Sequence, residues 1–193
     1  METTQVLRND EALAIRTGDL SDIPVIQRIA REAWHAAYGD IISEAFITHE
    51  LAREYSEAAL KDQMSESAHT FLMAELADGT VVGFASYGEL ASVSELSGAK
   101  RLAKLYKLYL LPELKGKGYG SALVNAVIAR CGQTGYEQLN LSVNRGNPAV
   151  AFYQRQGFSV LKEEDIVVGP GFVRHDYVMG KTLSLAAACQ ELA

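Results

Sequence analysis

The 193-residue chain has few cysteines and no long apolar run, and each scarcity excludes a class of protein. Only Cys131 and Cys189 are present, which is too few for a disulfide framework or a cysteine-based metal cluster. No apolar run approaches the length that spans a bilayer. Residues 1–4 contain neither the basic nor the apolar segment of a signal peptide. We therefore expect a soluble, cytoplasmic protein with no metal site and no membrane contact.

Positive charge is also in short supply. The chain has 18 basic against 24 acidic residues, a net charge of −6. Nucleic-acid-binding domains usually carry a basic patch, so nucleic acid is not an expected partner. The mild acidity suits a cationic small substrate, and it is equally ordinary for a soluble protein. Hydrophobic residues make up 48% of the chain, enough for the core of a single domain over residues 1–193 with a short tail at 184–193.

The expected order of elements indicates a mixed α/β fold. A strand, a helix and a second strand in succession require a parallel strand pair, whereas Asp78 and Gly79 give a strong antiparallel hairpin signal. The expected elements are strands at 12–16, 70–77, 80–87, 102–111, 139–144, 158–168 and 172–183, helices at 23–37 and 117–132, one or two helices within 43–67, and a loop at 89–100. A further short helix is expected to begin at Pro148, with Asn147 as its N-cap, and to end at Gly157.

Three glycines at alternate positions, Gly116, Gly118 and Gly120, separate an apolar strand from an amphipathic helix. Such spacing lets several backbone N–H groups point one way, and the helix start adds free donors and a positive dipole end. This arrangement predicts a phosphate or pyrophosphate site. A mononucleotide P-loop fails because Lys117 is followed by glycine, and a dinucleotide fingerprint needs Gly or Ala where Ser121 stands. A strand–helix turn without a ligand remains the alternative.

Residues 108–123 resemble the acetyl-CoA pyrophosphate motif of the GNAT superfamily of N-acetyltransferases. In that motif, Gln or Arg opens a run of the type Q/R-x-x-G-x-G/A. Lys115 stands at the opening position here, and Gly118 and Gly120 supply the small residues. Lysine lacks the planar head group of the motif, but the backbone cradle does not depend on it. Residues 144–158 resemble the second family signature, an Asn-started helix with an aromatic–Tyr pair and a closing Gly-Phe.

The C-terminal part adds a finer similarity. Residues 163–166 and 176–179 resemble a bacterial branch of the family that includes polyamine acetyltransferases. For the whole chain, the resemblance implies a central, mixed but mostly antiparallel sheet flanked by helices. Within that sheet a splayed parallel strand pair would form the cleft for the co-substrate, acetyl-CoA.

The family motifs also imply which residues contact acetyl-CoA. The backbone of the central strand would pair with the pantetheine, as a sheet edge receives an extended peptide, and one of its N–H groups would polarise the thioester carbonyl. The glycine loop would hold the pyrophosphate, and the neighbouring strand end would border the cleft. The implied contact residues are Leu108, Tyr109, Leu110, Lys115, Gly116, Lys117, Gly118, Tyr119, Gly120, Ser121, Asn144 and Asn147.

Tyr153 stands where the family motif places the proton donor to the leaving thiolate. The alternative for Tyr153 is simple packing under the short helix; of the adjacent pair, Phe152 is the better core candidate. The general base is open between Glu89, His175 and water. A covalent acyl-enzyme is disfavoured because Cys131 continues the apolar face of a helix and is expected to be buried.

The resemblance implies direct acetyl transfer to a small-molecule, polyamine or protein amine in a ternary complex. Trp34 and Tyr38, one helical turn apart, are candidates for the acceptor pocket wall, with core packing as the alternative for Trp34. The acidic run from Glu44 to Glu66 points to a cationic acceptor or, equally, to a solvated helix face. A non-catalytic acyl-CoA sensor is the rival function, and O-acyl or longer-acyl transfer is a third. A homodimer is left open.

Overall fold

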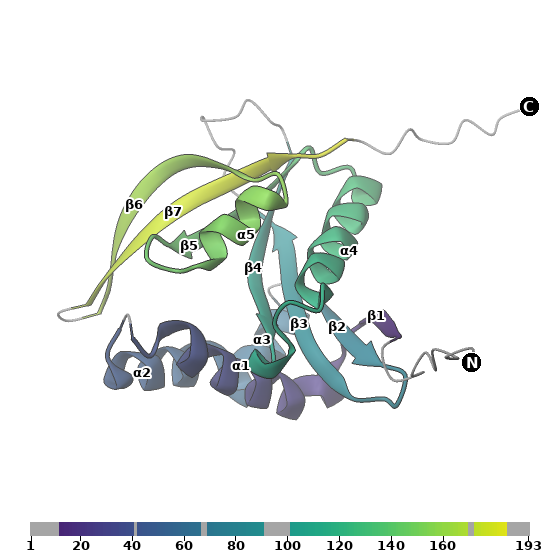
Figure 1. The fold of residues 1–193 in the computed structure, drawn as a ribbon, viewed down its shortest axis with the longest axis horizontal. Helices are drawn as coiled ribbons and strands as arrows, with labels where there is room; N and C mark the ends of the chain where they lie inside the picture. Colours follow the sequence, from purple (N-terminus) through teal and green to yellow (C-terminus); the bar gives the residue numbers. More distant parts are fainter. Residues whose placement is uncertain (1–11, 41, 67–68, 91–100, 170–171, 185–193) are drawn as a thin grey trace, which may run out of the picture.

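The computed structural model describes residues 12–40, 42–66, 69–90, 101–169 and 172–184. Within these ranges the strands form one seven-stranded sheet in the order β1-β2-β3-β4-β5-β7-β6, with helices on both faces (Figure 1). The strands are β1 (Leu13–Thr17), β2 (Thr70–Leu76), β3 (Val81–Glu89), β4 (Leu102–Leu110), β5 (Gln138–Asn144), β6 (Ser159–Gly169) and β7 (Phe172–Thr182). The helices are α1 (Ile23–Tyr38), α2 (Glu44–Tyr55), α3 (Glu57–Ser65), α4 (Tyr119–Thr134) and α5 (Ala149–Arg155), with short 3₁₀ turns η2 (Leu20–Asp22) and η3 (Pro112–Leu114).

All neighbouring strands pair antiparallel except β4 and β5, which are parallel. The parallel ladder runs only from Leu102 with Gln138 to Leu105 with Leu141. Beyond it, β4 continues to Leu110 and β5 to Asn144 without pairing to each other. The expected mixed sheet with a splayed parallel pair is therefore confirmed.

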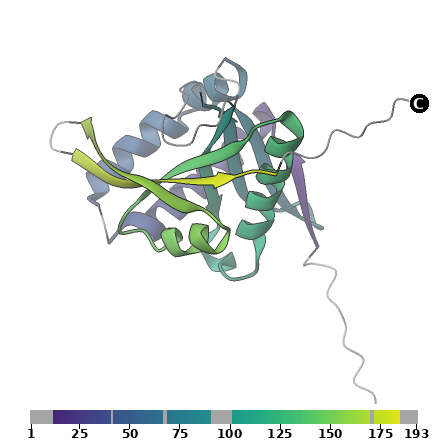
Figure 2. The same cartoon turned by 90° about the horizontal axis from the view of Figure 1, so that it is seen from above.

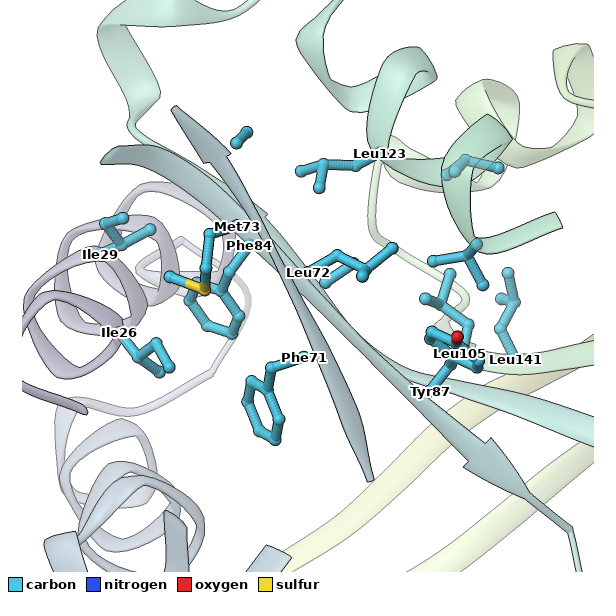
Figure 3. Packing of buried hydrophobic residues seen from close by; sticks show 14 of the residues in the cluster. Ile26, Ile29, Phe71, Leu72, Met73, Phe84, Tyr87, Leu105, Leu123 and Leu141 are labelled. Carbon is cyan, nitrogen blue, oxygen red and sulfur yellow. The ribbon is translucent and has the colours of Figure 1, made fainter. Parts of the chain in front are cut away.

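Two apolar layers hold the helices to the sheet. Figure 3 shows Ile26 and Ile29 of α1 against Phe84 on one face, and Leu123 of α4 with Leu72 on the other. All five side chains are fully buried or nearly so. Each such side chain stabilises the fold by roughly 1.5–3 kcal/mol relative to an exposed one. The sheet is thus a rigid support between α1–α3 and α4.

The helix ends follow local capping chemistry. The Ser43 and Ser56 hydroxyls each accept a hydrogen bond from a backbone N–H three residues on, which starts α2 and separates it from α3. Gly157 has φ +84° just after α5, as expected for a left-handed C-terminal glycine. The Asn147 side chain accepts from the Ala149 N–H at 2.8 Å, in the capping role expected of it, and α5 begins at Ala149, one residue after the expected first helical position at Pro148.

Other expectations differ from the structure in detail. The helix expected at 117–132 begins at Tyr119, because Gly118 takes a left-handed conformation and stays outside it. β5, the strand expected at 139–144 with one buried and one polar face, is buried on both faces near its start. There the Gln138 side chain donates a hydrogen bond to the Asn140 side chain at 2.6 Å. Most of the expected loop at 89–100 lies outside the described residues, as do Cys189 and most of the tail.

The C-terminal hairpin extends well beyond the rest of the sheet. In both views the end of β6 and the beginning of β7 reach over α2 (Figures 1 and 2). In Figure 2, α4 and α5 lie near one another, and the Gln156 side chain after α5 donates to the Ser121 hydroxyl of α4 at 2.9 Å. Within the described part of the chain, no helix is long and apolar enough to cross a membrane.

Candidate active site

The glycine loop joins β4 to α4. Gly116 and Gly118 have φ values of +85° and +86°, which side chains rarely adopt. Apart from the glycine and its two chain neighbours, no described atom lies within 4 Å of the position that a Cβ would take at either glycine. The first N–H groups of α4 belong to Tyr119, Gly120 and Ser121, and a helix has no internal acceptors for them. The loop is therefore open and presents donors suited to an anion.

Lysines border the same loop. Lys115 and Lys117 are both exposed, one on each side of Gly116. Gly120 has ordinary φ, and a Cβ there would lie 3.3 Å from Leu110 and 3.6 Å from Phe152. Glycine at this position lets α4 approach β4 and α5 closely.

The unpaired part of β4 adjoins this loop. Leu108, Tyr109 and Leu110 pair with β3 on one side only, opposite Ala85, Phe84 and Gly83. Their other side faces the opening where β5 diverges. An unpaired strand edge is a template for an extended ligand with amide groups.

Tyr153 projects from α5 into the interior. It is 9% exposed, and its ring packs edge-on against Phe152 and Phe158, with centroids 5.2 Å and 5.8 Å away. Burial raises the pKa of the phenol well above its usual value, and the nearby Tyr38 adds to the effect. The hydroxyl thus keeps its proton at neutral pH.

The expectation that Phe152 is the buried member of the pair is wrong. Phe152 is only partly buried and lies against Gly120 at the start of α4, whereas Tyr153 takes the inward direction. Adjacent helical residues do point to different faces, but α5 is packed through the face that carries Tyr153.

A cavity of about 490 Å³ lies beside the unpaired strand ends. Trp34 and Tyr38 of α1, the two candidates for the pocket wall, line it, and Trp34 is at the same time a core residue, 8% exposed. Its indole N–H donates to the Tyr55 hydroxyl at 3.4 Å. Tyr109 of β4 and Asn144 of β5 also line the cavity, and both lie where these two strands diverge. The cavity is therefore continuous with the cleft between β4 and β5.

The cavity wall carries charges of both signs. Arg53 binds buried Glu50 through two hydrogen bonds of 3.0 Å and 2.7 Å, and also pairs with Glu54 at 2.9 Å. Buried Lys107 pairs with Glu54 at 3.2 Å and lies over the Tyr55 ring at 5.1 Å. The lining carboxylates are Glu50, Glu54 and Asp176, and the lining cations are Arg53, Lys104, Lys107 and Arg174. With three carboxylates against four cations, the lining has a formal charge of +1 over the residues that the structure describes.

Asp176 and Arg174 were missed by sequence reasoning. Both lie on β7 and face the cavity, and Arg174 donates to Asp176 at 2.8 Å. The signal that could have found them is strand alternation. His175, which was singled out as a candidate base, lies between them and is not part of the lining. It is exposed and binds Asp165 at 2.9 Å.

Two other expectations about charge are changed by the structure. Glu89, the first carboxylate considered as a base, is exposed and pairs in register with Ala103, at the end of β4 away from the glycine loop. It does not line the cavity. Of the acidic run from Glu44 to Glu66, only Glu50 and Glu54 reach the cavity, and both are ion-paired there.

Two asparagines expected at the cleft are held in local turns. The Asn144 side chain accepts from the Gly146 N–H at 2.9 Å, and Asn147 also hydrogen bonds to Tyr38.

Cys131 is fully buried, as expected, and burial raises the pKa of its thiol to about 12. Among the described residues, no group of three His, Cys, Asp or Glu side chains could hold a metal ion.

A family model matches residues 28–158 of this chain, and its description is the acetyltransferase (GNAT) family. The matched region runs from α1 through the glycine loop to the end of the α5 segment.

Known relatives agree with this match. Spermidine N(1)-acetyltransferase of Thermoplasma acidophilum is 28% identical over 153 residues, which cover 77% of this chain and 89% of the relative. Mycothiol acetyltransferase of Saccharomonospora viridis is 32% identical over 133 residues, covering 67% of this chain and 43% of that one. The crystal structure of the PaiA N-acetyltransferase of Thermoplasma acidophilum in complex with coenzyme A superposes with a TM-score of 0.73 at 29% identity, covering 89% of this chain and 99% of the other.

Proposed function

The chain belongs to the acetyltransferase (GNAT) family, and on that premise we propose that it transfers the acetyl group of acetyl-CoA directly to an amine held in the cavity beside β4 and β5. As a member of the family it is an acetyl-CoA-dependent N-acetyltransferase. The observation that carries the proposal is the continuity of two sites. Tyr109 and Asn144 line the cavity and also stand on the strands that splay apart. A donor in the cleft and an acceptor in the cavity would then meet in one ternary complex.

We assign the glycine loop and the β4 edge to the donor. The N–H groups from Gly116 to Ser121 would hold the pyrophosphate, with Lys115 and Lys117 adding positive charge. The backbone from Leu108 to Leu110 would pair with the pantetheine amides. Asn144 and Asn147 would border the cleft through the turns that they close.

We assign Tyr153 to the leaving group. A thiol of this kind has a pKa of about 8.5, so the departing thiolate needs a proton source at neutral pH. The raised pKa of the Tyr153 phenol makes it a donor and prevents it from acting as a base. Cys131 is buried with a raised pKa, which disfavours a covalent acyl-enzyme.

The charge of the cavity bears on the acceptor. Thermoplasma acidophilum spermidine acetyltransferase, a relative, acts on a polyamine. The cavity of this chain has a formal charge of +1, and two of its carboxylates are bound by Arg53 or Lys107. It offers no excess of negative charge for a polycation. We therefore propose an acceptor with a single ammonium group, and one that also bears a carboxylate would suit the lining cations.

An acceptor panel tests this proposal. Acetyl-CoA is mixed with spermidine, α-amino acids, lysyl and N-terminal peptides, a simple alkylamine and a neutral alcohol, and thiol release is followed for each. We expect amine-dependent release, larger with amines that bear a carboxylate than with spermidine. Preferential use of spermidine would overturn the charge argument alone. Turnover only with the alcohol would overturn the amine assignment.

The rival function is a non-catalytic sensor of acyl-CoA. It predicts that acetyl-CoA binds, as measured by calorimetry, while no acceptor in the panel gives thiol release. The presence of a buried tyrosine at position 153 favours catalysis over sensing. A cytoplasmic location and a homodimer stay predictions.

A further inference from the structure

Asp176 is a buried carboxyl group in the wall of the cavity. Its residue is 2% exposed, although it lines the cavity. One carboxyl oxygen, Oδ2, accepts from the Arg174 guanidinium at 2.8 Å. The other oxygen, Oδ1, is buried and has no hydrogen-bond partner among the residues that the structure describes.

A buried carboxylate oxygen without a donor is costly. Leaving a buried polar group unsatisfied destabilises a protein by about 1–3 kcal/mol, and more when the group is charged. Native proteins therefore pair nearly all such atoms, and the exceptions require an explanation. A ligand that brings an N–H donor into the cavity would supply the missing partner.

The position of Asp176 is close to the expected reaction centre. It pairs in register with Asn144, at the end of β5 beyond the parallel ladder. Tyr38, another residue of the cavity wall, is near enough for Asp176 to influence its pKa, and Tyr38 in turn influences that of Tyr153. Tyr153 itself is not among the lining residues, and Tyr38 is the lining residue that lies near both groups.

We propose that Asp176 is the general base of acetyl transfer, whose free oxygen binds the acceptor ammonium and removes a proton from it. This inference rests on the function proposed above and deepens it. Glu89 and His175 do not line the cavity, so neither competes for this role from its position in the structure.

The protons balance as follows for an ammonium acceptor. Asp176 takes one proton, which leaves a neutral amine with a free lone pair. The amine nitrogen forms a bond to the acetyl carbonyl carbon, the carbon–sulfur bond breaks, and the thiolate takes the Tyr153 proton. The second nitrogen proton returns, directly or through water, to the Tyr153 oxygen. Asp176 releases its proton to solvent, so the products are an amide, the CoA thiol and one proton.

The surroundings of Asp176 are consistent with a base that works near neutral pH. Burial raises the pKa of Asp176 above its ordinary value. Arg174 on β7 and Lys104 on β4 lower it, and Glu164, the register partner on β6, raises it. Tyr38 on α1 is the uncharged titratable group facing it. Each of these neighbours can be altered separately.

The first test is Asp176→Asn, which keeps shape and removes the basic oxygen. We expect kcat to fall about 100- to 10,000-fold with the acetyl-CoA dissociation constant unchanged. Because burial of the charged form opposes folding at neutral pH, the melting temperature should not fall. Asp165→Asn, the same change at an exposed carboxylate on the adjoining strand, is the control and should retain wild-type kcat. A kcat within about threefold of wild type for Asp176→Asn would overturn the proposal.

The second test does not rest on that variant alone. The pH profile of kcat/KM for the acceptor should show an acidic limb that disappears in Asp176→Asn. Arg174→Gln and Lys104→Gln should move this limb to higher pH, and Glu164→Gln should move it to lower pH, because each removes a charge whose effect on Asp176 has the opposite sign. A limb that stays in place in all three variants, or that follows the acceptor amine's own pKa across two acceptors, would overturn the proposal.

The two levels of inference fail differently. If no amine supports thiol release by the wild-type protein, the proposed function is wrong and Asp176 has no reaction to serve. If wild-type turnover is clear but insensitive to Asp176, only the base assignment is wrong, and Asp176 is a structural partner of Arg174.

Discussion

Single side chains in this protein acquire their chemistry from burial. Tyr153 and Cys131 are both buried, and in both cases loss of water raises the pKa of the acid. For Cys131 this removes the thiolate and with it nucleophilic reactivity. For Tyr153 it preserves a proton that a thiolate can take. The same physical effect therefore makes one residue inert and equips the other for proton donation.

Tyr153→Phe isolates the hydroxyl, since the ring and its packing against Phe158 are kept. We expect kcat to fall about 100- to 10,000-fold, with little change in the acetyl-CoA dissociation constant or melting temperature. Tyr136→Phe, at a buried tyrosine whose ring packs under Arg101 and not in α5, is the control. Steady-state kinetics and a thermal melt on both variants check this. Near wild-type turnover for Tyr153→Phe would remove the residue from the mechanism.

Residue roles were predictable from the sequence only where a motif carried them. The family signature singled out Tyr153, and the glycine spacing singled out the loop. Asp176 lies in residues 176–179, whose similarity to a branch of the family assigned it no role, and its interest arises from one unpaired oxygen and a neighbouring cavity. The neighbouring His175 attracted attention by its residue type, but alternation on β7 turns it to the other face.

At the scale of elements, backbone conformation defines the candidate anion site. Two left-handed glycines end the segment after β4, and α4 begins directly behind them. Elements of this kind are predictable, because glycine spacing and apolar periodicity are local signals. The exact ends of the helices were less predictable. α4 begins two residues later than expected, because Gly118 takes a left-handed conformation before it, and α5 begins one residue later, at Ala149.

Gly118→Asp tests the loop. It adds bulk and negative charge at the proposed pyrophosphate site, so CoA binding measured by calorimetry should be largely lost while circular dichroism stays native. Gly79→Asp is a matched control, because Gly79 has φ +84° and likewise no described atom within 4 Å of its Cβ position. It imposes the same backbone strain in the β2–β3 turn and should leave CoA affinity unchanged. Equal affinity in both folded variants would contradict the assignment.

A separate ion pair ties β1 to the start of α1. Asp22 is buried and accepts from Arg16 at 2.7 Å and 2.8 Å, which lowers the pKa of its carboxyl. A lowered folded-state pKa stabilises the protein at pH values above the unfolded pKa of about 3.8, and this stabilisation is lost as pH falls through the folded value.

Asp22→Asn should therefore lower the free energy of unfolding by about 1–2 kcal/mol at pH 7, and the deficit should shrink below about pH 4. Arg16 is partly exposed, which keeps the expected loss at the low end for a buried pair. Urea denaturation at several pH values measures it. Glu32→Gln, at an exposed pair with Arg28, should have no resolvable effect. A deficit independent of pH would indicate that the charge is not the cause.

At the scale of the whole molecule, the cavity is assembled from segments that are far apart in the chain. Its wall combines α1, α2, β4, β5 and β7, and the beginning of β7 reaches over α2 (Figure 2). No local pattern predicts which charges meet there. The acidic run suggested a negative pocket, whereas Lys107 and Arg53 neutralise its two inward carboxylates. Fold class was predictable because element order constrains topology, but cavity charge depends on long-range side-chain pairing.

The central claim is that the acetyl group passes directly from acetyl-CoA to an amine in the adjoining cavity. Initial velocities measured over a grid of acetyl-CoA and acceptor concentrations test it most directly. Since both substrates must be bound together and Cys131 is buried, double-reciprocal lines should intersect, and alkylating reagents should leave the rate unchanged. Parallel lines, which indicate a covalent acetyl-enzyme, or the absence of any amine-dependent thiol release would contradict the account.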